Sequence, residues 1–140
     1  MAGAATPVHL CPTFLAAAKS DHPWCIDELL KQQQKGREGA DIETDTEEKD
    51  YSTGKSALMY AAELGHIDAM CVLIDGGAVV DATSINGHTP LMYAAANGHF
   101  NCVRALLERD ANVHSKAHKG QTALMLVLTT YYYIRIYNSS

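Results

Sequence analysis

Three stretches of this chain repeat the same run of residue types at a spacing of 33 residues, beginning at Thr53, Asn86 and Lys119. This spacing constrains the fold more than any other feature of the sequence. The first two copies share the run Leu-Met-Tyr-Ala-Ala and end in Gly-His, whereas the third departs after Leu-Met. A unit this short cannot bury its apolar face alone, so it must stack on its neighbours. The repeat therefore predicts an elongated array of similar units.

Residue types within each copy predict two consecutive helices. Thr89 is suited to cap the start of a helix with its hydroxyl group, and Pro90 fits the first helical position. Leu91 begins an apolar stripe with helical spacing. Gly98 can end this helix because glycine readily takes the left-handed conformation. We expect the second helix at about residues 101–108, where the apolar spacing continues.

The pattern Gly-x-Thr-Pro-Leu-x-x-Ala-Ala-x-x-Gly-His at residues 87–99 closely resembles the ankyrin repeat, and residues 54–66 match it with Ser-Ala replacing Thr-Pro. The resemblance implies an all-α fold, a solenoid of helix-turn-helix units joined by β-hairpin loops. One departure is consistent, because Met59, Met92 and Met125 follow the leucine where the family usually has histidine. We expect apolar packing to replace the hydrogen bond of that histidine.

The repeat divides the chain into six segments. We expect an N-terminal tail (1–12), a degenerate first ankyrin repeat with insertions (13–49), two complete repeats (50–82 and 83–115), an incomplete repeat (116–130) and a divergent C-terminal tail (131–140). The degenerate repeat rests on an alignment that places Phe14 on Leu91 and His22 on His99. We expect residues 32–37 to form an extended or frayed end of its second helix. A helical N-terminal cap outside the repeat pattern is the alternative.

At the C-terminus, Tyr131-Tyr132 stand where the repeat has Gly-His. The following residues are rich in aromatic and β-branched types, which favour a strand over a helix. No polar capping repeat follows, although a solenoid normally needs one for solubility. Two interpretations remain open: a segment that folds back over the last repeat, or a truncated array whose tail is poorly protected.

Composition excludes several classes of function. The formal net charge of −5 argues against nucleic acid as the main partner. The uncharged, apolar-rich stretch at residues 121–134 is shorter than the ~20 residues needed to span a membrane, and residues 1–10 do not resemble a signal peptide. The four cysteines form no C-x-x-C pair, so we expect free thiols. We therefore predict a monomeric cytoplasmic protein, with a nuclear location also open.

Motifs of catalysis and metal binding are missing from the sequence. It contains no G-x-S-x-G, no P-loop lysine motif and no H-E-x-x-H. Three histidine–cysteine pairs are close in sequence: His22 with Cys25, His66 with Cys71, and His99 with Cys102. Their spacings differ and give no two-plus-two ligand set. We expect no enzymatic activity, no catalytic residues, no metal and no cofactor.

The resemblance also implies a surface for a protein partner, because the ankyrin family holds partners with hairpin tips and the exposed side of each first helix. Matching positions here are Ser52, Thr53, Lys55, Glu63, Leu64, Ile85, Asn86, His88, Ala96, Asn97, His118, Lys119 and Gln121. Ile85 and Leu64 are the sharpest candidates, since exposed apolar residues have no structural need there. Simple solvated surface is the alternative for each.

We expect a protein–protein interaction module or adaptor that binds another protein on its concave face. An inhibitory or regulatory subunit of an enzyme, and a truncated fragment of a larger repeat protein, remain open. Tyr60 and Tyr93 occupy equivalent helix positions and either pack between repeats or form an aromatic ladder for a partner. Six acidic residues between positions 41 and 50 form either a solvated loop or an arm that steers a basic partner.

Overall fold

The structure, a computed structural model, describes residues 11–36 and 48–138. Seven α-helices follow one another in these residues: α1 (Phe14–Lys19), α2 (Pro23–Gly36), α3 (Ala57–Leu64), α4 (Ile67–Asp75), α5 (Pro90–Ala96), α6 (Phe100–Glu108) and α7 (Ala123–Asn138). The only β pairing in the described part is an isolated antiparallel bridge between Lys49 and Ser56. The expected all-α fold is confirmed.

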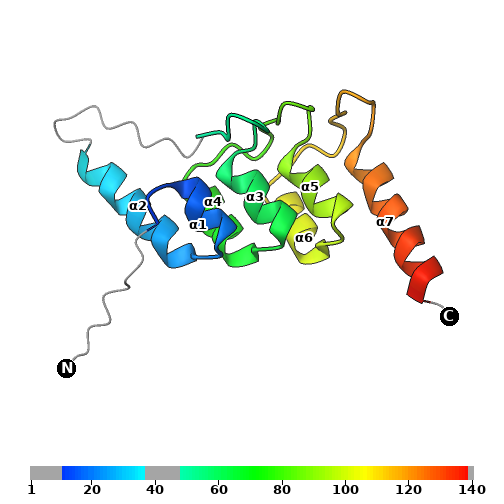
Figure 1. The fold of residues 1–140 in the computed structure, drawn as a ribbon, viewed down its shortest axis with the longest axis horizontal. Coiled ribbons are helices and arrows are strands. Elements are labelled where there is room, and N and C mark those ends of the chain that lie inside the picture. The colour runs from blue at the N-terminus through cyan, green and yellow to red at the C-terminus, as the bar shows by residue number, and fades with distance from the viewer. Residues whose placement is uncertain (1–10, 37–47, 139–140) are drawn as a thin grey trace.

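The helices lie in two rows (Figure 1). First helices α1, α3, α5 and α7 pack side by side in one row, and second helices α2, α4 and α6 pack in the other. Consecutive helices also contact each other in pairs, α1 with α2, α3 with α4 and α5 with α6. The long loops between successive pairs project together at the top of Figure 1. This arrangement is the expected solenoid, in which each pair contacts only its neighbours.

Local signals place the helix ends as expected. The hydroxyl of Thr89 accepts a hydrogen bond from the backbone N–H of Met92 at 3.3 Å, and Pro90 is the first residue of α5. Ser56 caps α3 in the same way, so the change from threonine to serine keeps the cap. Gly98, which follows the C-cap residue Asn97 of α5, takes a φ of +72°. The second helix, α6, begins one residue before the predicted position and ends at the predicted residue.

Small and flexible apolar side chains fill the space between the first helices. Ala61 and Ala94 are fully buried, which lets neighbouring helices approach closely. Met59 and Met92 are also buried, which confirms the expected apolar packing at two of the three methionine positions. The expectation is wrong for Met125, which is 54% exposed. No helix follows α7 in the described part of the chain to cover this residue.

Helices α1 and α2 form the first pair of the array. Helix α2 has 14 residues whereas α4 and α6 have nine each, so the expected extension of this second helix is confirmed as far as Gly36. The Nδ1 atom of His66 lies 2.7 Å from the carbonyl oxygen of Ala18, which ties the α3–α4 turn to α1. The inserted residues 37–47, with most of the acidic run, lie outside the described residues.

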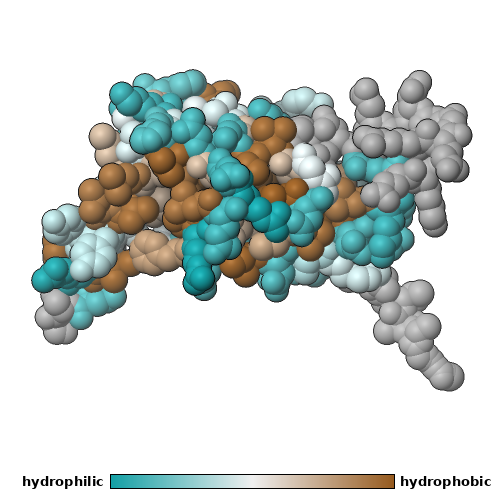
Figure 2. Space-filling view, turned by 180° about the vertical axis from the view of Figure 1, so that it is seen from behind, coloured by the Kyte–Doolittle hydropathy of each residue, from teal (hydrophilic) through white to brown (hydrophobic). Residues whose placement is uncertain are grey.

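The prediction that the C-terminal tail favours a strand is wrong. Residues 123–138 form one continuous helix, α7, which crosses the boundary expected after residue 130. Strand preference depends on a neighbouring strand for hydrogen bonding, whereas a helix satisfies its backbone locally, and no glycine or proline interrupts α7. Figure 2 shows apolar residues gathered over this end of the array. No described segment folds back over this end of the array. Separately, none of the described helices is long and apolar enough to cross a membrane.

Candidate partner-binding surface

The hairpin loops at the ends of the repeats are hydrogen-bonded to one another. The backbone N–H of Ile85 donates to the carbonyl of Thr53 at 3.2 Å, and 33 residues later the N–H of His118 donates to the carbonyl of Asn86 at 3.1 Å. The same bond therefore recurs in successive repeats. Because each tip is fastened to the one before it, the side chains of neighbouring tips have a fixed spacing.

At the first hairpin tip, the Asp50 carboxylate accepts three hydrogen bonds. It accepts from the backbone N–H of Ser52 at 2.9 Å, from the Ser52 hydroxyl at 2.6 Å and from the Tyr60 hydroxyl at 2.6 Å. The Nζ of Lys19 lies 3.7 Å away. These hydrogen bonds, those of Ser52 first, hold the pKa of the Asp50 carboxyl well below its ordinary value. The Ser52 side chain is thus engaged within its own loop.

Tyr60 and Tyr93 connect each first helix to its hairpin. The Tyr60 hydroxyl donates to Asp50, and the Tyr93 hydroxyl donates to the Oγ of Ser84 at 2.8 Å. Both rings are half-buried. Of the two interpretations left open by the sequence, the contacts favour packing within the array, with the hydroxyl groups fixing the loops.

Lys55, in the hairpin before α3, and Glu63, in α3, form an ion pair within one repeat. The Nζ of Lys55 lies 2.7 Å from a carboxylate oxygen of Glu63, and it also lies over the rings of Tyr60 and Tyr93, at 5.3 and 4.8 Å from their centroids. Burial alone would lower the pKa of the ammonium group, but the hydrogen bond and charge of Glu63 outweigh it and raise the pKa. These two candidate residues therefore hold each other in place.

His88 and Gln121 occupy the position equivalent to Lys55 in the following repeats. The His88 ring lies 5.5 Å from the ring of Tyr93, and its buried Nδ1 has no hydrogen-bond partner among the described residues. Gln121 is half-buried, and its backbone carbonyl accepts from the N–H of Ala117 at 2.9 Å. The candidate residues at this position of the repeat, Lys55, His88 and Gln121, are therefore more buried than the sequence suggested.

The remaining candidates differ in exposure. Ile85 is 62% exposed and Leu64 is 45% exposed. The other exposed candidates are Ser52, Asn86, Ala96, Asn97, His118 and Lys119, whereas Thr53 and Glu63 are half-buried. Leu64 is the last residue of α3, whereas Ile85 lies at a hairpin tip and is hydrogen-bonded to Thr53, which precedes the start of that helix. The two apolar candidates belong to different parts of the surface.

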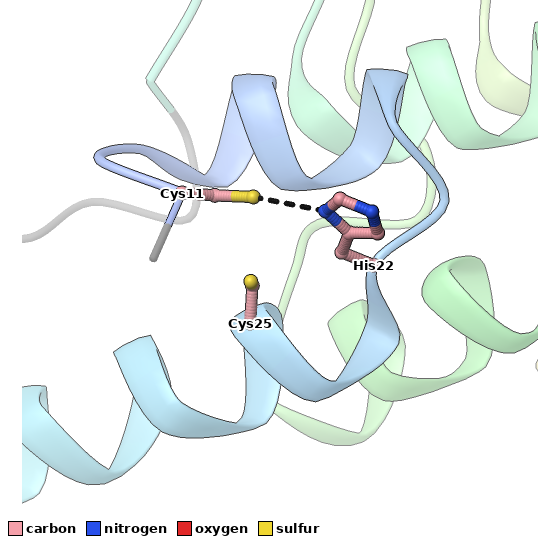
Figure 3. A group of neighbouring side chains, drawn as sticks. All are labelled: Cys11, His22 and Cys25. Carbon is pink, nitrogen blue, oxygen red and sulfur yellow. Dashed lines mark hydrogen bonds between the residues drawn. The ribbon is translucent and has the colours of Figure 1, made fainter. Parts of the chain in front are cut away.

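The sequence missed one grouping of side chains. Cys11 lies close to His22 and Cys25, and the potential ligand atoms of all three lie within 4.8 Å of one another (Figure 3). The closest pair is the Sγ of Cys11 and the Nδ1 of His22, at 3.3 Å. Burial, followed by the neighbouring Cys25 thiol, raises the pKa of Cys11 to about 11. No spacing rule reveals Cys11, because helix α1 separates it from the other two residues.

Comparison with known proteins supports the repeat architecture. A search of curated proteins found no match to this sequence. The sequence model of a family described as "Ankyrin repeats (3 copies)" matches residues 13–117 and 77–133, which together span most of the chain. Ankyrin repeats generally mediate protein–protein interactions and are typically not enzymes. With matching repeats, two rows of helices and linked hairpin tips, this chain belongs to the ankyrin-repeat family.

Proposed function

We propose that this protein binds a partner protein through its hairpin-tip surface, defined by Ser52, Thr53, Ile85, Asn86, His118 and Lys119. The observation that carries the proposal is the pair of equivalent bonds between successive tips, Ile85 to Thr53 and His118 to Asn86. A surface whose parts are already fixed relative to one another loses little conformational entropy when it binds. A partner therefore meets a preformed row of side chains.

The chemistry of this surface suits an apolar contact with a polar border. Ile85 is the exposed apolar side chain of the middle tip, and exposed polar residues lie beside it and on both neighbouring tips. Binding free energy in protein interfaces concentrates in a few central residues that a less important rim shields from water. About three repeats offer only a modest contact area, so we expect micromolar affinity, about −8 kcal/mol.

An affinity purification from cell lysate tests the proposal. The native chain is compared with a tip variant, in which Ser52, Ile85, Asn86 and His118 are changed to alanine. A matched control carries alanine at Asn101, Arg104, Leu107 and Glu108, which are exposed residues of α6 in the other row of helices. We expect a partner that the native chain and the control retain and the tip variant loses.

The contrary result is equally clear. Retention of the same proteins by all three chains, or loss in the α6 control alone, would remove the tip surface from consideration. Circular dichroism of each variant establishes that it is folded. Adding the identified partner's own activity assay distinguishes an adaptor from a subunit that regulates an enzyme.

We extend the proposal to a monomeric protein of the cytoplasm or nucleus. None of the four cysteines, all of which lie in the described part of the chain, is in a disulfide bond, which suits a reducing compartment. A fluorescent fusion locates the protein, and analytical ultracentrifugation measures its mass in solution. Residence in a secretory compartment or a stable dimer would contradict this part of the proposal.

A further inference from the structure

The turn between α1 and α2 brings together three side chains that commonly bind thiophilic metal ions. Cys11 precedes α1, His22 lies in the turn, and Cys25 is in the first turn of α2 (Figure 3). Both cysteines are buried, whereas His22 is exposed. Figure 3 shows the two sulfur atoms and the ring of His22 pointing toward a common space. The group thus has an enclosed side and a side open to solvent.

The distances are close to those of a metal centre. In a tetrahedral zinc site, two thiolate sulfurs lie about 3.8 Å apart, and a sulfur and an imidazole nitrogen lie about 3.6 Å apart. Here the Cys11 sulfur and the His22 Nδ1 are already 3.3 Å apart, and no pair of ligand atoms is separated by more than 4.8 Å. The widest pair therefore needs to close by at most about 1 Å to reach the spacing of a tetrahedral site.

His22 differs in its contacts from His66, the equivalent histidine of the next helix pair. His66 uses its Nδ1 to contact the carbonyl of Ala18 in the preceding repeat, at 2.7 Å, so there this histidine joins two helix pairs. The pair α1–α2 is the first in the described chain, and His22 directs its Nδ1 to the sulfur of Cys11 instead. Stacking therefore explains His66 but does not explain the placement of His22.

Packing in the core explains the presence of Cys25 but not that of the exposed His22 beside two thiols. Cys25 occupies the same position as Cys102, and both are buried in the core, so burial alone accounts for a small residue there. Burial does not account for an exposed histidine beside two thiols. Among the described residues, this is the only group of at least three histidine, cysteine or acidic side chains whose ligand atoms converge in this way.

We propose that Cys11, His22 and Cys25 form a zinc-binding site that fastens residue 11 to the beginning of α2. Two thiolates and an imidazole are typical zinc ligands, whereas magnesium and calcium prefer oxygen. Each thiol releases its proton to the solvent when it binds the ion. A water molecule completes the tetrahedron on the side where His22 is exposed. The ion thereby ties together the two ends of α1 and strengthens the first helix pair.

Metal titration of the full chain tests the site. The chain is first stripped of metal and kept reduced with a phosphine. Zinc is then added in competition with a chromogenic chelator, and Co²⁺ serves as a spectroscopic probe, because thiolate ligands give it intense charge-transfer absorption. We expect one equivalent of metal to bind. Cys11→Ala, His22→Ala and Cys25→Ala should each abolish this binding step, whereas Cys71→Ala and His114→Ala, outside the group, should retain it.

His22→Ala keeps the test decisive if Cys25→Ala does not fold, because His22 is exposed and its removal leaves the core intact. Circular dichroism of each variant shows whether it is folded. Absence of zinc binding, or zinc binding retained in folded His22→Ala, overturns the proposal. Since the tip surface is untouched by these variants, the outcome is independent of the proposed partner binding.

Discussion

The Nζ of Lys55 lies 2.7 Å from the carboxylate of Glu63, with only 16% and 29% of the two side chains exposed. Both residues match positions that contact partners in ankyrin proteins, yet in this chain they hold each other. The Lys55 ammonium also lies over the Tyr93 ring of the next repeat. The pair therefore contributes to stacking, and a partner would have to compete with Glu63 for this lysine.

Replacing Lys55 by alanine should lower the free energy of unfolding by about 1–2 kcal/mol, because it removes a partly buried ion pair and a cation–π contact. Urea denaturation measures the change. Lys119→Ala, at the exposed third tip, is the matched control and should change stability by less than about 0.5 kcal/mol. Equal effects of the two substitutions would show that Lys55 has no special role in stacking.

Removing the Tyr60 hydroxyl should raise the pKa of Asp50. In the native chain, hydrogen bonds from Ser52 and Tyr60 favour the ionised carboxylate. Because the folded-state pKa is depressed, the resulting stability is present above the unfolded pKa of about 3.9 and is lost as the pH falls toward the folded value. An NMR titration of the Asp50 carboxyl in Tyr60→Phe measures the shift. Native stability should also fall between pH 5 and pH 3, by less in the variant.

Tyr93→Phe is the control for that titration. Tyr93 occupies the equivalent position but donates its hydroxyl to Ser84 instead of Asp50. The pKa of Asp50 should stay unchanged in this variant. A comparable rise in both variants would trace the effect to general loosening of the helices and not to the hydrogen bond.

Gly65→Ala should destabilise the array by about 2–3 kcal/mol. Gly65 has a φ of +76°, and a Cβ atom there would lie 2.7 Å from the Nδ1 of His99. Gly77→Ala isolates the conformational part of this effect, because Gly77 also has a positive φ but has no atom within 4 Å of an added Cβ. It should lose only about 1 kcal/mol. Thermal unfolding of both variants measures the difference, and equal losses would contradict a clash with His99.

The hydroxyl of Thr130 should help to hold α7 against α5. Its oxygen lies 3.1 and 3.0 Å from the carbonyl oxygens of Ala95 and Ala96 and 2.9 Å from that of Leu126 in its own helix, so its single proton can be donated to any one of the three. Thr130→Val should therefore lower stability by about 1 kcal/mol. Thr129→Val is the matched control, since the Thr129 hydroxyl bonds only within α7, to the carbonyl of Met125. Equal stability of the two variants would remove Thr130 from this role.

Hydrogen exchange should divide α7 into two parts. Residues 123–130 pack on α5 and should exchange slowly, whereas residues 131–138, whose side chains are all exposed, should exchange faster. Mass spectrometry or NMR measures the amides of α7 beside those of α5. Uniform protection along α7 would show that its distal half is covered by contacts absent from this structure.

The sequence was most informative where an interaction acts over a few residues or recurs at a fixed interval. The caps of α5 and the left-handed Gly98 depend on the residue types themselves, so they could be predicted locally. The 33-residue period required stacking, because one unit cannot bury its apolar face. For the same reason, positions of the hairpin tips could be assigned before any contact between them was visible.

Expectations failed or remained open where the neighbours of a residue determine its state. The aromatic residues of the tail favour strands, yet without a strand beside them they continue α7. Met125 has the same place in the repeat as Met59, but only Met59 has helices around it to bury it. Residue type alone contains no information about such coverage.

The sequence by itself therefore determined the class of fold, the period and the helix starts, because these follow from local hydrogen bonding and from the periodic placement of apolar residues. Tertiary structure alone decided that Lys55 pairs with Glu63 and that Cys11 meets His22 and Cys25. Those groups combine residues whose spacing fits no recurring pattern, and they come together only after helices pack at particular distances and angles. Helix packing determines which side chains become neighbours, and those neighbours determine how far a side chain is buried, how its charge is paired and which ligands it can bind.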